Sequence, residues 1–192
     1  MNPNRWFNLP DMREKRNGPA AVCLPGDSRV FVFTGSNGSY LASVEFCRLE
    51  TDWEEATATS ARTADFWQAA APMRTARYAP AATLFRGRII VAGGENLRSI
   101  NGGWSRLSRL NVVEMFTPPD ASCPLGHWTE LTEMKQDRWH FTLLTSADAV
   151  FALGGSWGMH DCHPLVLHSF SLIHALLHKA HLKRQKNNSI CL

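Results

Sequence analysis

The stretch that decides the fold is residues 67–94, WQAAAPMRTARYAPAATLFRGRIIVAGG. In it a methionine follows the tryptophan by six positions and an arginine follows the methionine by four. Two apolar runs separated by a turn come next, and the second run ends in two glycines. The same order of residues starts at Trp6 and at Trp128, and Trp67 lies midway between them in the sequence. This constant spacing, which we call the repeat period, indicates a repeat architecture.

The key positions recur in three copies. The methionines are Met12, Met73 and Met134, and the arginines are Arg16, Arg77 and Arg138. A later Val-Glu-x-aromatic segment is present at residues 43–46 and 112–116. These motifs, over about residues 5–158, resemble the kelch repeat of β-propellers. Thr34 stands where the family usually has the first of two glycines, which weakens the turn in that repeat.

The resemblance implies an all-β fold: an incomplete kelch-type β-propeller of about three repeats, each a four-stranded antiparallel blade. The repeats span about residues 6–66, 67–127 and 128–158. Short β-rich runs bounded by Gly, Pro and polar clusters agree with this fold. Closed propellers have roughly four to eight blades. Three repeats therefore predict an open arc that exposes apolar faces and unpaired strand edges.

Residues 159–192 form a histidine-rich tail outside the kelch pattern. No further Val-Glu-x-aromatic segment and no fourth repeat tryptophan follow Gly155, so we expect the tail to add no strand. Apolar residues at helical spacing over about 168–184 predict a short helix, with disorder as the alternative. Zinc binding by the tail would need several converging ligands, and a solvated polar face is the expected alternative. The candidate ligands are His160, Cys162, His163, His174, His178 and His181.

The bulk composition excludes several classes of protein. The 192 residues are 44% hydrophobic and 19% charged, as in an ordinary globular chain. The net charge is only +3 and much of it lies in the tail, which does not form the basic stripe of a nucleic-acid interface. The histidines that interrupt the apolar run 165–182 argue against a membrane span. The five scattered cysteines predict reduced thiols and a cytoplasmic protein.

Candidate partner-binding residues follow from the resemblance. In kelch adaptors, the loop before the innermost strand and the loop after the glycines line one face of the ring, where arginines bind acidic peptides. The matching positions here are Arg16, Arg77, Arg138, Ser36, Glu95 and Ser156. The alternative for the arginines is structural, in which each pairs with a carboxylate or carbonyl between blades.

A long insertion at residues 95–111 is expected on the same face. It carries residue types that are common at binding hot spots, namely Arg98, Trp104, Arg106 and Arg109. The alternative is an irregular excursion rich in Gly, Ser and Asn.

The resemblance implies a protein-interaction module of the substrate-recruiting or actin-binding type, with an acidic peptide or actin as partner. Recruitment to a ubiquitin ligase would require a BTB domain, for which no room exists before Trp6. We predict no cofactor and no enzymatic activity, because the tyrosine and cysteine metal ligands of kelch-type oxidases have no counterpart. The alternatives are a kelch-type oxidase or sugar epimerase, and a truncated fragment without function.

Overall fold

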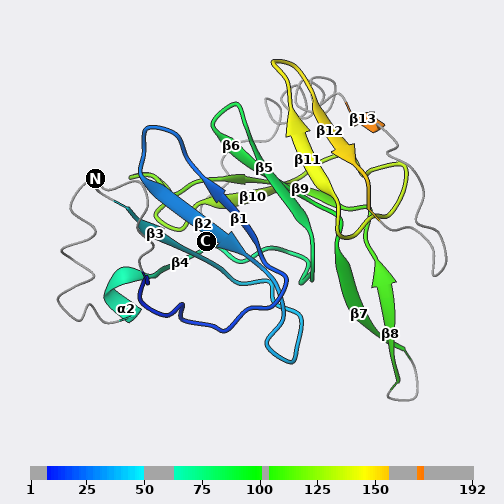
Figure 1. Cartoon of the computed structure of the whole chain (residues 1–192), viewed down its shortest axis with the longest axis horizontal. Helices are drawn as coiled ribbons and strands as arrows, with labels where there is room; N and C mark the ends of the chain where they lie inside the picture. The colour runs from blue at the N-terminus through cyan, green and yellow to red at the C-terminus, as the bar shows by residue number, and fades with distance from the viewer. Residues whose placement is uncertain (1–7, 50–62, 101–103, 156–167, 171–192) are drawn as a thin grey trace.

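A computed structural model describes residues 8–49, 63–100, 104–155 and 168–170 (Figure 1). This part of the chain consists of small antiparallel sheets and one short helix, α2 (Thr63–Phe66). The predicted all-β class is therefore confirmed. No helix among these residues has the length and apolar character needed to cross a membrane.

The first two sheets each contain four antiparallel strands, as the repeats predict. The first has the order β1 (Ala20–Cys23), β2 (Arg29–Phe33), β3 (Val44–Arg48), β4 (Gln68–Ala70). The second has the order β5 (Ala81–Phe85), β6 (Arg88–Ala92), β9 (Val113–Thr117), β10 (His127–Glu130). Each apolar run of the sequence forms one strand, and the turn of Arg86 and Gly87 joins β5 to β6.

Two features differ from the expectations. The insertion at 95–111 is not an irregular loop but a hairpin of β7 (Glu95–Ile100) and β8 (Trp104–Arg109). The third sheet contains β11 (Thr142–Thr145), β12 (Val150–Leu153) and β13 (His168–Phe170), so the tail does add a strand. Residues 168–170 are thus extended, where a helix was expected. The physical reason is that β12 offers unpaired backbone groups, which any extended segment can pair with regardless of its side chains.

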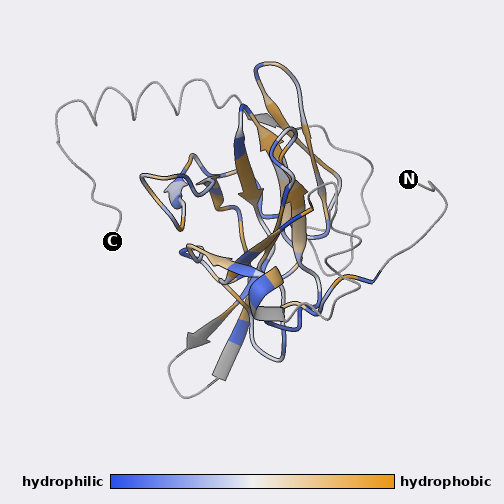
Figure 2. Ribbon diagram, turned by 90° about the vertical axis from the view of Figure 1, so that its left-hand side faces the viewer, coloured by the Kyte–Doolittle hydropathy of each residue, from blue (hydrophilic) through white to orange (hydrophobic). Residues whose placement is uncertain are grey.

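The hydrophobic core lies between successive sheets. Figure 1 shows how these sheets are arranged, and the apolar segments of their strands are orange in Figure 2. Phe116 of the second sheet meets Phe31 and Phe33 of the first at ring-centroid distances of 5.5 and 5.9 Å. On the other side of the second sheet, Ile90 belongs to the cluster that contains Leu143 of the third. The second sheet is therefore covered on both faces, which explains why its strands are continuously hydrophobic instead of alternating.

The repeat tryptophans make the same tertiary hydrogen bond in successive repeats. Trp67 Nε1 donates to the carbonyl of Pro10 at 2.8 Å, and Trp128 Nε1 donates to the carbonyl of Ala71 at 2.8 Å. The two donors are separated by one repeat period, and so are the two acceptors. The sequence period is therefore also a period of the three-dimensional contacts.

The glycine ends of the strands form the joints between sheets. The amide of Gly35 donates to the carbonyl of Arg77 at 3.1 Å, and that of Gly94 donates to the carbonyl of Arg138 at 2.7 Å. Gly94 has a φ of 92°, and an added Cβ would lie 2.6 Å from the carbonyl oxygen of Tyr78. Thr34 adopts a φ of 59° at the position of the missing glycine, and its buried hydroxyl has no hydrogen-bond partner within the described residues.

The described cysteines differ in state. Cys23 is a free exposed thiol, and Cys47 is a free buried thiol whose pKa burial raises to about 11. Cys123 is disulfide-bonded. The expectation that every cysteine is a reduced thiol is therefore wrong at Cys123.

Candidate functional site

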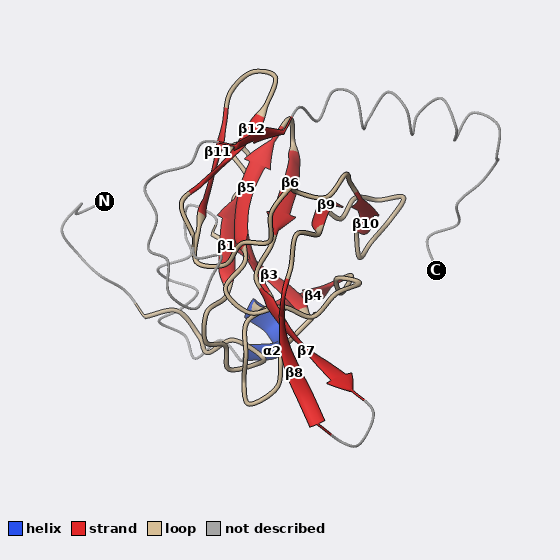
Figure 3. Ribbon diagram, turned by 90° about the vertical axis from the view of Figure 1, so that its right-hand side faces the viewer, coloured by secondary structure: helices blue, strands red, loops and turns tan. Residues whose placement is uncertain are grey.

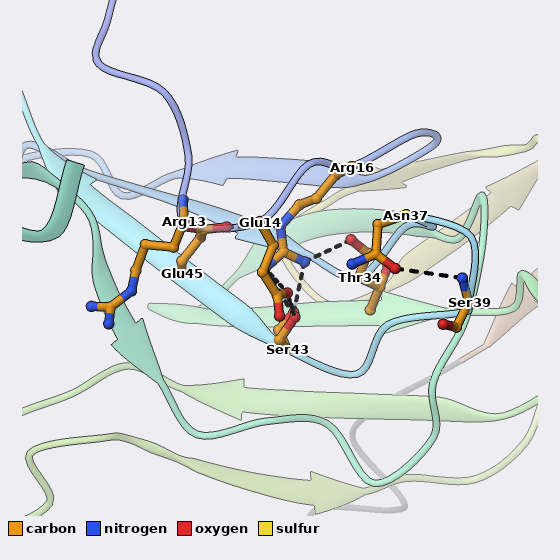
Figure 4. A network of polar contacts seen from close by, with 8 residues as sticks. All are labelled: Arg13, Glu14, Arg16, Thr34, Asn37, Ser39, Ser43 and Glu45. Atoms are coloured by element: carbon orange, nitrogen blue, oxygen red, sulfur yellow. Dashed lines mark hydrogen bonds and ion pairs between the residues drawn. The ribbon is translucent and has the colours of Figure 1, made fainter.

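The guanidinium of Arg16, the first repeat arginine, donates hydrogen bonds to groups of its own chain (Figure 4). Arg16 Nε donates to Glu45 Oε1 at 2.9 Å, and Arg16 Nη1 donates to the carbonyls of Thr34 and Ser43 at 2.8 and 3.0 Å. The other oxygen of Glu45 accepts from the amide of Arg13 at 2.9 Å. The Val-Glu-x-aromatic strand thus supplies the carboxylate that holds both the arginine and the loop before β1.

The second repeat builds the same network in a fully buried form. Arg77 Nη2 pairs with Glu114 Oε2, and Arg77 Nη1 donates to the carbonyls of Gly93 and Val112 at 2.9 and 3.1 Å. The amide of Arg74 donates to Glu114 Oε1 at 3.1 Å. Burial lowers the pKa of Arg77, and the adjacent Glu114 carboxylate opposes that shift. The ion pair therefore ties the loop before β5 to β9.

The third repeat arginine is also buried. Arg138 Nη1 donates to the carbonyl of Gly154 at 2.5 Å, and Nη2 donates to Gln136 Oε1 at 3.2 Å. The side chains of Arg16, Arg77 and Arg138 are all almost inaccessible to solvent. These contacts match the structural alternative for the arginines, so we do not place them in a partner-binding surface.

A different set of side chains gathers where the loops before β3, β5 and β11 meet the start of β7 and the end of β8. We call it the aromatic cluster, and its members are Tyr40, Tyr78, Glu95, Arg109, Trp139 and His140. The rings of Tyr40 and Tyr78 stack at 5.8 Å with an interplanar angle of 17°. The ring centre of His140 lies 6.0 Å from that of Tyr78 and 4.5 Å from that of Trp139. The Arg109 guanidinium lies 6.0 Å from the Trp139 ring centre.

The backbone positions this cluster through the repeat. Gly18, Ala79 and His140 occupy the same place in the three repeats, and their φ values are 60°, 48° and 49°. The amide of Ala79 donates to the carbonyl of Gly18 at 3.0 Å, and that of His140 donates to the carbonyl of Ala79 at 3.3 Å. An added Cβ on Gly18 would meet the Tyr78 ring at 2.4 Å. The glycine thus lets the Tyr78 ring lie directly on the backbone of the previous repeat.

Glu95 provides the charge of the aromatic cluster. Its backbone pairs with Tyr78 in both directions, at 2.8 and 2.9 Å, and its side chain is buried. Burial raises the pKa of Glu95, while electrostatic interactions with Arg109 and His140 act in the opposite direction. Burial also raises the pKa of Tyr40, with a further contribution from Glu95. The cluster can therefore offer flat aromatic faces, a protonatable carboxylate and a guanidinium to a ligand.

We expect Glu95→Gln to change the dependence of stability on pH. The folded-state pKa of Glu95 is raised, so the wild type is favoured when this carboxyl is protonated and loses that advantage as pH rises through the folded pKa. The free energy of unfolding of the variant, relative to that of the wild type, should therefore be higher at about pH 7 than at about pH 4. Urea unfolding at both pH values measures this. An equal difference in the free energy of unfolding at the two pH values would contradict the shift.

The β7–β8 hairpin projects away from the sheets (Figures 1 and 3). Leu97 and Leu107 face each other across it and are 42% and 51% exposed. Arg106 is exposed, and Arg109 reaches back to the aromatic cluster through Trp139. The side chains of Arg98 and Trp104 lie outside the described residues.

The remaining candidates separate into two groups. Ser36 and Asn17 pair through their backbones at 2.8 and 2.9 Å, in the same way as Glu95 and Tyr78. Ser156 lies outside the described residues, and so do all the candidate zinc ligands of the tail. Glu95 and Arg109 do lie together, as members of the aromatic cluster. Sequence reasoning missed Tyr78 and Trp139, although each directly follows a repeat arginine.

The comparisons with known proteins bear on the fold alone. No family model and no curated protein matches the chain. Among the solved structures that match is one described as "Structure of YjhT", with a TM-score of 0.57 and 17% sequence identity. The match covers 80% of this chain and 42% of that one. The chain thus spans less than half of the structure that it resembles.

Proposed function

We propose that this chain is an arc of a kelch-type β-propeller that serves as a non-catalytic protein-interaction module. The kelch assignment rests on the three concordant sequence repeats and on tertiary bonds that recur with them. The function rests on the β7–β8 hairpin, which presents two exposed leucines on a projecting support. Exposed apolar side chains on a projecting strand pair that also carries arginines are typical of protein-binding surfaces.

The chemistry of the hairpin defines the partner. Leu97 and Leu107 offer apolar contact, while Arg106 and Arg109 offer positive charge. The complementary partner is a segment with apolar and acidic side chains, which fits the acidic peptide or actin expected from the sequence. Substrate recruitment for a ubiquitin ligase belongs to the same proposal and would need a BTB domain in the assembly.

Leu97→Asp/Leu107→Asp is expected to remove partner binding with little effect on folding, because both side chains are exposed. Affinity capture from a cytosolic extract, with quantitation of each captured protein, should show at least about a tenfold loss. Leu125→Asp is the matched control, since Leu125 is an exposed leucine outside the hairpin. Retention of the same proteins by the double variant would contradict the proposed surface.

A second candidate function is that of a kelch-type enzyme, an oxidase or a sugar epimerase. The observation that favours it is the raised pKa of Glu95 beside His140, because perturbed carboxyl groups cluster at functional sites. Assays for oxidation and epimerisation, with Glu95→Gln as the inactive control, distinguish this candidate from the interaction module.

A further inference from the structure

The third sheet has two unlike faces. Leu143, Val150 and Ala152 lie on the face that packs against the second sheet, and all three are buried. The strand register places Leu144 opposite Phe151 on the other face, together with Leu153. Leu144 is 52% exposed, while Phe151 and Leu153 are half-buried. We call the set of Leu144, Phe151 and Leu153 the tail face.

The repeat shows what normally covers such a face. One repeat period before the tail face are Thr83, Ile90 and Ala92 of the second sheet. Ile90 and Ala92 are buried in the cluster that the second sheet forms with the third. The tail face is therefore the repeat equivalent of a face that this chain covers with a following sheet.

The first sheet presents the complementary kind of face. The register places Ala21 opposite Val32 and Cys23 opposite Val30, on the side away from the second sheet. Ala21 and Cys23 are exposed. We call Ala21, Cys23 and Val30 the head face.

The repeat equivalents of Ala21 and Cys23 are Ala82 and Leu84, one repeat period later. Both pack against the first sheet. The head face is therefore the repeat equivalent of a face that packs on the preceding sheet. The tail face lacks a covering face of this kind.

The strand count points the same way. The third sheet has three strands within the described residues, whereas the first and second have four. Pro10 accepts the hydrogen bond of the Trp67 indole. Ala71 accepts the equivalent bond of Trp128, and Ala71 directly follows the fourth strand of the first sheet. Pro10 thus has the place of the residue that follows a fourth strand, and it lies against Trp67 at the head end of the arc.

We propose that two copies of this chain associate head to tail, with the tail face of each packed on the head face of the other. The inference rests on the ring architecture put forward under the proposed function. Without the projecting β7–β8 hairpin, each copy has three stacked sheets, so two copies supply six, which lies within the roughly four to eight of closed rings.

A second copy fits these faces because the contact continues an interface that the chain already makes twice. It covers both open ends at once and removes their apolar surface from water. A heterologous contact between the two ends of one molecule closes into a ring when the rotation allows it and otherwise grows into a filament. Closure at two copies gives a dimer with twofold symmetry.

The mass of the full chain in solution tests the proposal. Sedimentation equilibrium of the wild type should give twice the 21.5 kDa of one chain, and Leu144→Asp should give a monomer. Leu125→Asp is the control, because Leu125 is 55% exposed and lies on neither face. A monomeric wild type, an open series of larger oligomers, or an unchanged dimer of Leu144→Asp would overturn the proposal.

Mixing two variants tests the head-to-tail geometry. Cys23→Asp should also be monomeric, because it places a charge on the head face. A mixture of Cys23→Asp and Leu144→Asp contains one intact head face and one intact tail face, so dimers should reappear at a higher protein concentration. Circular dichroism confirms that both variants remain folded. A dimeric Cys23→Asp, or a mixture of the folded variants without dimers, would overturn the proposal. The hairpin leucines are unchanged in both, so partner capture still tests the proposed function separately.

Discussion

Glu114→Ala is expected to lower the free energy of unfolding by about 3–5 kcal/mol, because it leaves the guanidinium of Arg77 buried without its carboxylate. Both side chains of the pair are inaccessible to solvent. The substitution also removes the acceptor of the Arg74 amide, so the loop before β5 loses two of its attachments to β9. Urea unfolding followed by circular dichroism measures the change.

Two further variants show that the effect comes from the buried charge. Arg77→Met/Glu114→Leu removes both charges and should recover much of the loss, since apolar replacements of buried ion pairs are often well tolerated. Glu130→Ala removes an exposed partner of Arg74 and should cost at most about 1 kcal/mol. A Glu114→Ala effect as small as that of Glu130→Ala would mean that water reaches Arg77.

Trp67→Ala should lower the free energy of unfolding by about 3–5 kcal/mol, the usual cost of truncating a buried aromatic side chain. Trp67 is buried against Val32 and Cys47 of the first sheet, and its indole donates to the carbonyl of Pro10. The variant therefore loses packing and leaves a backbone acceptor without its donor. Thermal or urea unfolding gives the difference from the wild type.

Trp67→Phe separates these two contributions. It keeps most of the aromatic packing and removes the hydrogen bond to Pro10, so it should cost about 1 kcal/mol plus a smaller packing loss. If Trp67→Ala were no worse than Trp67→Phe, the packing of the indole against the first sheet would contribute little to stability.

The first two sheets could be predicted because their signals are local. The hairpin strands β1, β2, β5 and β6 are short runs of mostly apolar residues, and glycine-containing turns separate the two runs of each hairpin. The repeat period then adds a Val-Glu-x-aromatic strand and a strand at the next repeat tryptophan to each hairpin, which makes four strands in each sheet. β13 could not be predicted, because its pairing with β12 comes from backbone groups that every sequence carries. The hairpin was missed because residues 95–111 contain few β-branched residues, so the strand register is visible only in the structure.

The site was predicted less well than the fold, for a reason that concerns the arginines. A regular arginine spacing fits a binding role and a buried ion pair equally well from the sequence. Glu45 and Glu114 were already visible in the Val-Glu-x-aromatic strands, and their side chains are the partners of Arg16 and Arg77. The aromatic cluster depends on contacts between repeats, such as the stacking of Tyr40 on Tyr78, which sequence spacing does not reveal.

The recurrence of the same bonds at each joint has a consequence for cooperativity. Each sheet is coupled mainly to its sequence neighbours, through bonds such as those of Gly35 to Arg77 and Gly94 to Arg138. In such a linear array, stability is close to a sum of the units and their nearest-neighbour couplings. Within a single copy of the chain, the second sheet has two couplings and each terminal sheet has one, so unfolding begins at the ends and the second sheet (β5, β6, β9 and β10) is the last unit to open.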